Sequence, residues 1–177
     1  GFAHLFEHMM FQGSVNVDKD NHFEVLKKMG SEQINGTTNP DRTNYFEVVP
    51  ANQLEAVLWL ESDRMGHMLP FLDKASLDNQ IDTVKNERRQ KYDNVAYRKA
   101  LFAEYETLYP QEGHPYRHLT IGKHEDLQAA TVDDVKGFFK TWYVPANATI
   151  TIVGNIDVAK TKQLVDKWFG GFPKSEK

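Results

Sequence analysis

The sequence contains no cysteine among its 177 residues. This absence excludes disulfide bonds, zinc sites built on thiolates, and cysteine nucleophiles. Any transition-metal site in this chain must therefore be built from histidine and carboxylate side chains.

Long apolar runs and basic clusters are also missing. No apolar run approaches the roughly 20 residues that a membrane-spanning helix needs, so no transmembrane segment is predicted. The formal net charge is −4, which disfavours nucleic acid as a partner. Hydrophobic residues make up 40% of the chain, as in an ordinary globular protein, and neither a repeat nor a low-complexity tract divides it. We therefore predict a single domain over residues 1–177.

The opening segment, residues 1–11, is apolar except for three side chains that form a His-x-x-Glu-His motif. If the segment is helical, His4 and His8 lie one above the other on the same face, because positions i and i+4 are neighbours there. Two imidazoles at this spacing can bind one Zn²⁺, and Glu7 beside them can take a proton from a water. This order of residues is the inverzincin motif.

A simpler interpretation is that these are surface histidines at helical spacing. Two features favour a metal site instead. Polar groups in an otherwise apolar helix are partly buried and need partners, and carboxylates that could supply a third ligand occur downstream. From the residues alone many carboxylates remain candidates, and Glu87 is preferred because it lies on a long amphipathic helix.

The remaining pattern predicts a mixture of helices and strands. Turn residues between β-branched and aromatic segments predict a hairpin over residues 31–49, and apolar periodicity predicts the helices. Alternation of apolar residues predicts a strand over 147–153. Helices are expected near residues 1–13, 20–29, 50–65, 74–92, 97–108, 131–142 and 157–169, with a loop over 111–124.

Seven segments in the same order resemble the pitrilysin-type zinc peptidases of the M16 family, and in particular its bacterial two-domain members. They are residues 1–8, 35–38, 41–46, 86–89, 114–116, 142–147 and 153–154. The resemblance implies an α+β fold with helices packed on one face of a mainly antiparallel sheet. It also implies that the family domain begins with strands upstream of residue 1, so that this chain is incomplete at its N-terminus.

The resemblance implies a zinc site with His4, His8 and Glu87 as ligands and with Glu7 as the general base. Many relatives carry a second acidic residue seven positions before the ligand glutamate. Here that position is Gln80, which leaves a supporting carboxylate in question.

The resemblance also implies a route for substrate. In the family an exposed edge strand pairs with the peptide backbone, and here that strand would carry the substrate-binding residues Asn35, Gly36, Thr37 and Thr38. His114 falls in a loop that borders the cleft in the family.

The function implied is that of a zinc-dependent endopeptidase acting on peptides or unstructured polypeptides. The alternative is a non-catalytic M16-like partner subunit, structural or peptide-binding. A second M16-type domain or subunit is expected to close the cleft, and without it these residues are expected to be poorly active. The family favours the bacterial periplasm or cell envelope.

Overall fold

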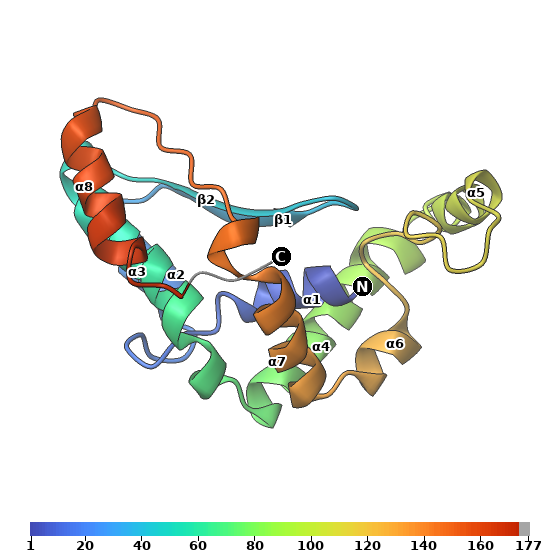
Figure 1. The fold of residues 1–177 in the computed structure, drawn as a ribbon. Helices are drawn as coiled ribbons and strands as arrows, with labels where there is room; N and C mark the ends of the chain where they lie inside the picture. Colours follow the sequence, from blue (N-terminus) through green and yellow to red (C-terminus); the bar gives the residue numbers. More distant parts are fainter. Residues whose placement is uncertain (174–177) are drawn as a thin grey trace. The chain divides into compact units, whose positions relative to one another are not determined.

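A computed structural model describes residues 1–173 of the chain, and its fold is α+β (Figure 1). Within these residues two strands, β1 (Gln33–Thr38) and β2 (Thr43–Val48), form an antiparallel hairpin, as predicted. The helices are α1 (Phe2–Met9), α2 (His22–Lys28), α3 (Leu54–His67), α4 (Lys74–Arg88), α5 (Ala100–Leu108), α6 (His124–Ala129), α7 (Val132–Trp142) and α8 (Val158–Phe169). The chain divides into two compact units, each of which has its own packing.

The first unit comprises residues 1–9, 36–45 and 73–131. In this unit α1 packs against α4 and α6, and α4 packs against α6 (Figure 1). Leu5 and Phe6 of α1 and Val84 of α4 are fully buried, so the apolar side chains of the two helices hold them together. The helix that carries the motif is thereby fixed beside the helix that carries Glu87.

Local interactions explain where α4 begins and ends. At its start the Asp73 side chain accepts a hydrogen bond of 2.7 Å from the backbone N–H of Ser76, which satisfies a donor that the helix leaves free. At its end a π-helical turn, Arg89–Asp93, follows Arg88, so the α-helix is shorter than the predicted 74–92. The Arg88 guanidinium lies 4.8 Å from the centre of the Phe102 ring and donates to the Gly122 carbonyl. These contacts tie the π-helical turn to its surroundings.

The second unit comprises residues 10–35, 46–72 and 132–173. Here α3 packs against α8. The Asp157 side chain caps α8 by accepting a hydrogen bond from the backbone N–H of Lys160, so this helix begins at the start of the predicted range 157–169. Buried Asp63 on α3 accepts hydrogen bonds from Ser14 and Asn16 and so holds the loop before α2. The core of the unit is formed by Val17, Leu26, Val57 and Leu60.

The predicted strand over residues 147–153 is wrong. In the described part of the chain Asn147 ends a 3-10 turn, Pro145–Asn147, and residues 148–153 lie outside any sheet. Ile150 and Val153 are exposed. An alternating pattern fits a half-buried strand, but a strand also requires a neighbour to pair its backbone groups, and residues 1–173 provide none here.

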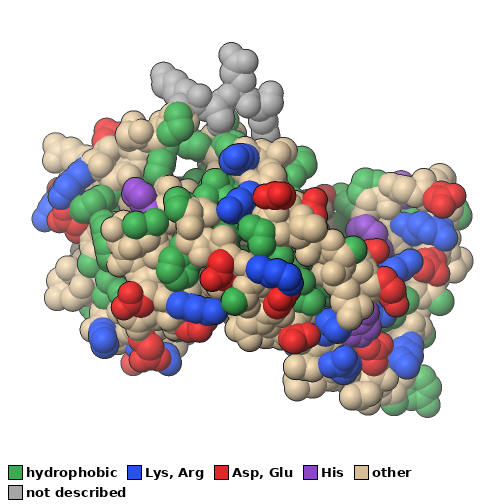
Figure 2. Space-filling view, turned by 90° about the horizontal axis from the view of Figure 1, so that it is seen from below, with side chains coloured by type: hydrophobic (Ala, Val, Ile, Leu, Met, Phe, Trp, Pro, Cys, Tyr) green, Lys and Arg blue, Asp and Glu red, His purple; other side chains and the backbone are tan. Residues whose placement is uncertain are grey.

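Charged side chains of both signs are interspersed over the face shown in Figure 2. Among the described residues, no helix is both long and apolar enough to cross a membrane.

Candidate metal centre

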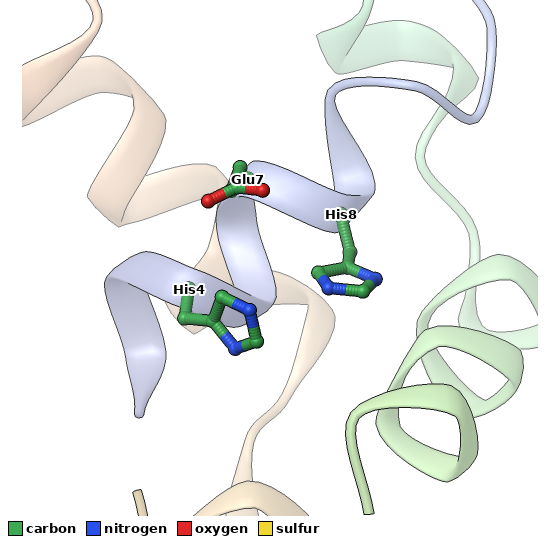
Figure 3. Close-up of side chains that lie close together, drawn as sticks. All are labelled: His4, Glu7 and His8. Atoms are coloured by element: carbon green, nitrogen blue, oxygen red, sulfur yellow. The ribbon is translucent and has the colours of Figure 1, made fainter. Parts of the chain in front are cut away.

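Helix α1 presents His4 and His8 from the same side, one turn apart (Figure 3). Their ring centres are 4.8 Å apart and the rings are nearly perpendicular. Nitrogen atoms of the two rings and a carboxylate oxygen of Glu7 all lie within 4.8 Å of one another. The predicted helix thus brings the three polar residues of the motif into one cluster.

Glu87 reaches the same cluster from α4. Its Oε2 atom lies 3.5 Å from Nε2 of His4 and 3.3 Å from Nε2 of His8. Zinc binds imidazole nitrogen at about 2.0–2.1 Å and carboxylate oxygen at about 2.0–2.2 Å, so tetrahedral geometry places two donor atoms about 3.3–3.5 Å apart. The distances in this structure match that spacing. They fit one zinc ion held by His4, His8 and Glu87.

Two carboxylates, Glu7 and Glu87, compete for the position of third ligand. Glu7 Oε2 accepts a hydrogen bond from the Thr38 hydroxyl. Its side chain also lies against Gly36, where an added Cβ would come within 2.9 Å of Glu7 Cγ. Glu87, by contrast, directs a single oxygen at both imidazoles. This arrangement favours Glu87 as the ligand and leaves Glu7 beside the site.

The ionisation of these groups suits a divalent cation. Burial lowers the pKa of His4 to about 4, so its imidazole is neutral at pH 7 and keeps a lone pair for a metal. A hydrogen bond with His8 is the main cause that lowers the pKa of Glu87 to about 2, which keeps this carboxylate ionised. At neutral pH His4 therefore offers a neutral donor and Glu87 a negatively charged one.

Glu7 differs from Glu87 in its environment. The residue is 7% exposed, and burial raises the pKa of its carboxyl above the ordinary value, while the hydrogen bond from Thr38 opposes that rise. A raised pKa makes a carboxylate a stronger base, which suits proton transfer near neutral pH.

One departure from usual metal sites concerns His4. A metal-bound histidine normally donates its second ring N–H to a carboxylate or a carbonyl. Nδ1 of His4 is buried and has no hydrogen-bond partner among the described residues. The orientation of this ring is therefore fixed by packing within α1 and by Glu87.

The predicted substrate-binding residues lie on β1, but they differ in their surroundings. Gly36, Thr37 and Thr38 belong to the first unit, and Asn35 belongs to the second. Thr38 touches the Thr43 hydroxyl at 3.2 Å in addition to Glu7. The exposed Thr37 side chain is hydrogen-bonded to Asn44 on β2. Sequence analysis assigned Thr38 to a strand expected to bind peptide and missed its contact with Glu7.

Gln80 is buried on α4, two helical turns before Glu87. His114 lies in the predicted loop and stacks on Tyr109 at 4.7 Å, with its Nδ1 accepting from the N–H of Tyr116. The Tyr116 hydroxyl in turn donates to Asp41 in the turn of the hairpin. The contacts of His114 are those of a residue that shapes this loop.

Lys91 was missed by the sequence analysis. Its ammonium lies 2.6 Å from Oε1 of Glu87, the oxygen that does not face the histidines. The spacing of the two residues in the sequence could have predicted this contact, because a lysine four positions after a glutamate lies on the same helix face.

Comparisons with known proteins identify the family of this chain. Residues 1–110 match the model of the Insulinase family (peptidase family M16), and residues 129–177 match the Peptidase M16 inactive domain. The chain therefore belongs to the M16 family of peptidases. His4, Glu7, His8 and Glu87 all fall within the first of these two matches.

Three relatives illustrate the similarity. The Helicobacter pylori zinc protease PqqE is 31% identical over 169 residues, which are 96% of this chain and 37% of that protein. The crystal structure of a protease from Helicobacter pylori matches with a TM-score of 0.91 and 28% identity, over 99% of this chain and 41% of the other. The periplasmic protease PqqL from Escherichia coli shares the fold, with a TM-score of 0.84 and 22% identity, over 99% of this chain and 20% of the other. The chain thus spans less than half the length of these relatives.

Proposed function

We propose that this chain carries the catalytic centre of a zinc-dependent endopeptidase that cleaves peptides or unstructured polypeptides. The observation that carries the proposal is the position of Glu87 Oε2, 3.3 and 3.5 Å from the two imidazole nitrogens of the motif. The proposal is supported by membership of the M16 family and by the similarity to the Helicobacter pylori zinc protease PqqE.

In this proposal His4, His8 and Glu87 hold the metal. Bound zinc supplies a Lewis acid that lowers the pKa of a water and polarises the scissile carbonyl. Glu7 accepts the proton of the attacking water and returns it to the leaving amine. Thr38 donates to one oxygen of Glu7 and leaves the other available for this transfer. A second M16-type domain or subunit would enclose the substrate and add support for the developing oxyanion.

The alternative of a non-catalytic M16 subunit is favoured by one observation, the match of residues 129–177 to the inactive-domain model. That match does not include the four residues of the candidate site, which lie in the Insulinase match. Two measurements separate these functions: a zinc endopeptidase retains zinc and cleaves peptide in a chelator-sensitive way, whereas a non-catalytic subunit does not cleave peptide.

We expect the purified chain to retain about one zinc and, together with the second M16-type domain or subunit that closes the cleft, to cleave a quenched fluorescent peptide without stable structure. A chelator should abolish cleavage and added Zn²⁺ should restore it, since His4, His8 and Glu87 act only through the metal. Mg²⁺ is the control, because it prefers oxygen ligands in octahedral geometry and should not restore activity. Cleavage that is indifferent to the chelator would contradict a metal-dependent mechanism.

The substrate route proposed is strand addition to β1. Among the described residues β1 has one strand neighbour, β2. At the turn of the hairpin the Asn39 N–H donates to the Arg42 carbonyl at 2.9 Å, so these two residues face each other across the strands as a hydrogen-bonded pair. Along an antiparallel strand, residues whose backbone groups bond the adjacent strand alternate with residues whose backbone groups point away from it. The alternation directs the backbone groups of Thr38 away from β2. A peptide pairing there would lie beside Glu7, which Thr38 contacts.

N-methylation of the substrate tests this route. In a strand that pairs with β1, every second backbone N–H points at β1, so methylating those nitrogens should lower kcat/KM about 5- to 10-fold each. Methylation of the intervening nitrogens is the matched control and should have little effect. The measurement is kcat/KM for a series of singly methylated peptides. A profile without period two would exclude strand addition as the binding mode.

A further inference from the structure

We propose that Lys91 is a positioning residue of the metal centre. Its ammonium holds one oxygen of Glu87, so that only the other oxygen is available to the metal. This inference rests on the proposed zinc site and adds to it a residue that controls how the metal is coordinated.

The two oxygens of Glu87 face different partners. Oε2 is directed at Nε2 of His4 and of His8, at 3.5 and 3.3 Å. Oε1 lies 2.6 Å from Nζ of Lys91, the length of a charge-assisted hydrogen bond. An oxygen held in this way has one lone pair engaged by the ammonium, and the positive charge of Lys91 repels a second cation there, so Oε1 is a poorer metal ligand than Oε2.

The consequence concerns the number of ligands. A carboxylate can bind a metal through one oxygen or through both. Catalytic zinc sites have three protein ligands and keep a fourth position for water or substrate. If Glu87 bound through both oxygens, it would occupy part of the space that the fourth position needs. Lys91 therefore favours the coordination that leaves the metal open to a reactant.

The backbone that carries Lys91 is held in place. Lys91 lies in the π-helical turn Arg89–Asp93, directly after the helix that carries Glu87. Arg88, the last residue of α4, contacts the Gly122 carbonyl and the Phe102 ring, and its Nε lies 3.6 Å from Asp93 Oδ2 in the turn. The ammonium is thereby kept within reach of Glu87.

Lys91 contributes little to the stability of the fold. Its side chain is 66% exposed, and ion pairs of exposed side chains contribute little to folding. An effect of Lys91 on the metal should therefore be separable from an effect on folding.

The test compares three variants by zinc affinity and by the visible spectrum of the Co²⁺-substituted protein. Lys91→Met removes the ammonium, and Lys91→Arg keeps a cation that can donate to Oε1. Lys74→Met is the matched control, because Lys74 forms an i,i+4 pair with Asp78, also at 2.6 Å and on the same helix. Urea unfolding of each variant monitors the fold.

We expect Lys91→Met to weaken zinc binding by about 10- to 100-fold, as for other residues that orient a metal ligand. Its Co²⁺ spectrum should weaken and shift towards that of a higher coordination number, while its unfolding midpoint stays near that of the wild type. Lys91→Arg should recover most of the affinity and the spectrum, and Lys74→Met should change neither.

The inference would be overturned if Lys91→Met had the zinc affinity and the Co²⁺ spectrum of the wild type. Wild-type protein that binds no zinc would overturn the proposed function itself. The two failures are therefore distinguishable.

Discussion

Replacing His8 with alanine is expected to lower zinc affinity by at least about 10³-fold, because it removes one of three donors from a site whose total binding free energy is large. The same loss is expected for His4→Ala and Glu87→Ala, since Glu87 Oε2 lies at similar distances from both imidazoles. The measurement is a competition titration against a chromophoric chelator, with zinc stoichiometry determined by native mass spectrometry.

Two controls define the specificity of this loss. Glu7→Gln should keep its zinc, because Glu7 lies beside the site and accepts from Thr38. His67→Ala should also keep it, because His67 is an exposed histidine that contacts Asp63 on its own helix. Loss of zinc from Glu7→Gln equal to that from His8→Ala would show that the roles of the two carboxylates are assigned wrongly.

Glu7→Gln is expected to lower kcat by about 10² to 10⁴-fold, the usual contribution of a positioned general base. Glutamine has nearly the same shape and can still accept the hydrogen bond from Thr38, but it cannot take up a proton. KM should change little if the peptide is held mainly through its backbone on β1. The assay is cleavage of the quenched peptide at saturating zinc, with wild type and variant measured side by side.

The control for this second prediction is the zinc content of the variant, which must equal that of the wild type for the loss to be assigned to proton transfer. A rate within threefold of the wild type, still sensitive to a chelator, would mean that another group acts as the base. Thr38 is not that group, because its hydroxyl is a donor to Glu7 in this structure.

Much of the site could be predicted from the sequence because it depends on local geometry. The spacing of His4 and His8 predicts that they lie side by side on one helix face, and the structure shows them there (Figure 3). Asp157 likewise predicts the start of α8, because a helix cap involves only the next few residues.

Glu87 shows where local reasoning stops. Periodicity indicates that it lies on a helix, but a periodic pattern does not say which distant helix that residue meets. The resemblance to the M16 family singled out Glu87. The packing of α1 against α4 accounts for the contact, because it directs Glu87 Oε2 at both imidazoles.

The sequence by itself determined the motif helix, the hairpin, most of the other helices and the histidine and carboxylate chemistry of any metal site. Only the tertiary structure decided that residues 147–153 lack a strand partner in the described chain, that α4 ends in a π-helical turn, and that Thr38 and Lys91 contact the two glutamates. The physical reason is the range of the interactions. Helix faces and caps depend on residues a few positions apart, whereas strand pairing and contacts between elements depend on which distant segments the fold brings together.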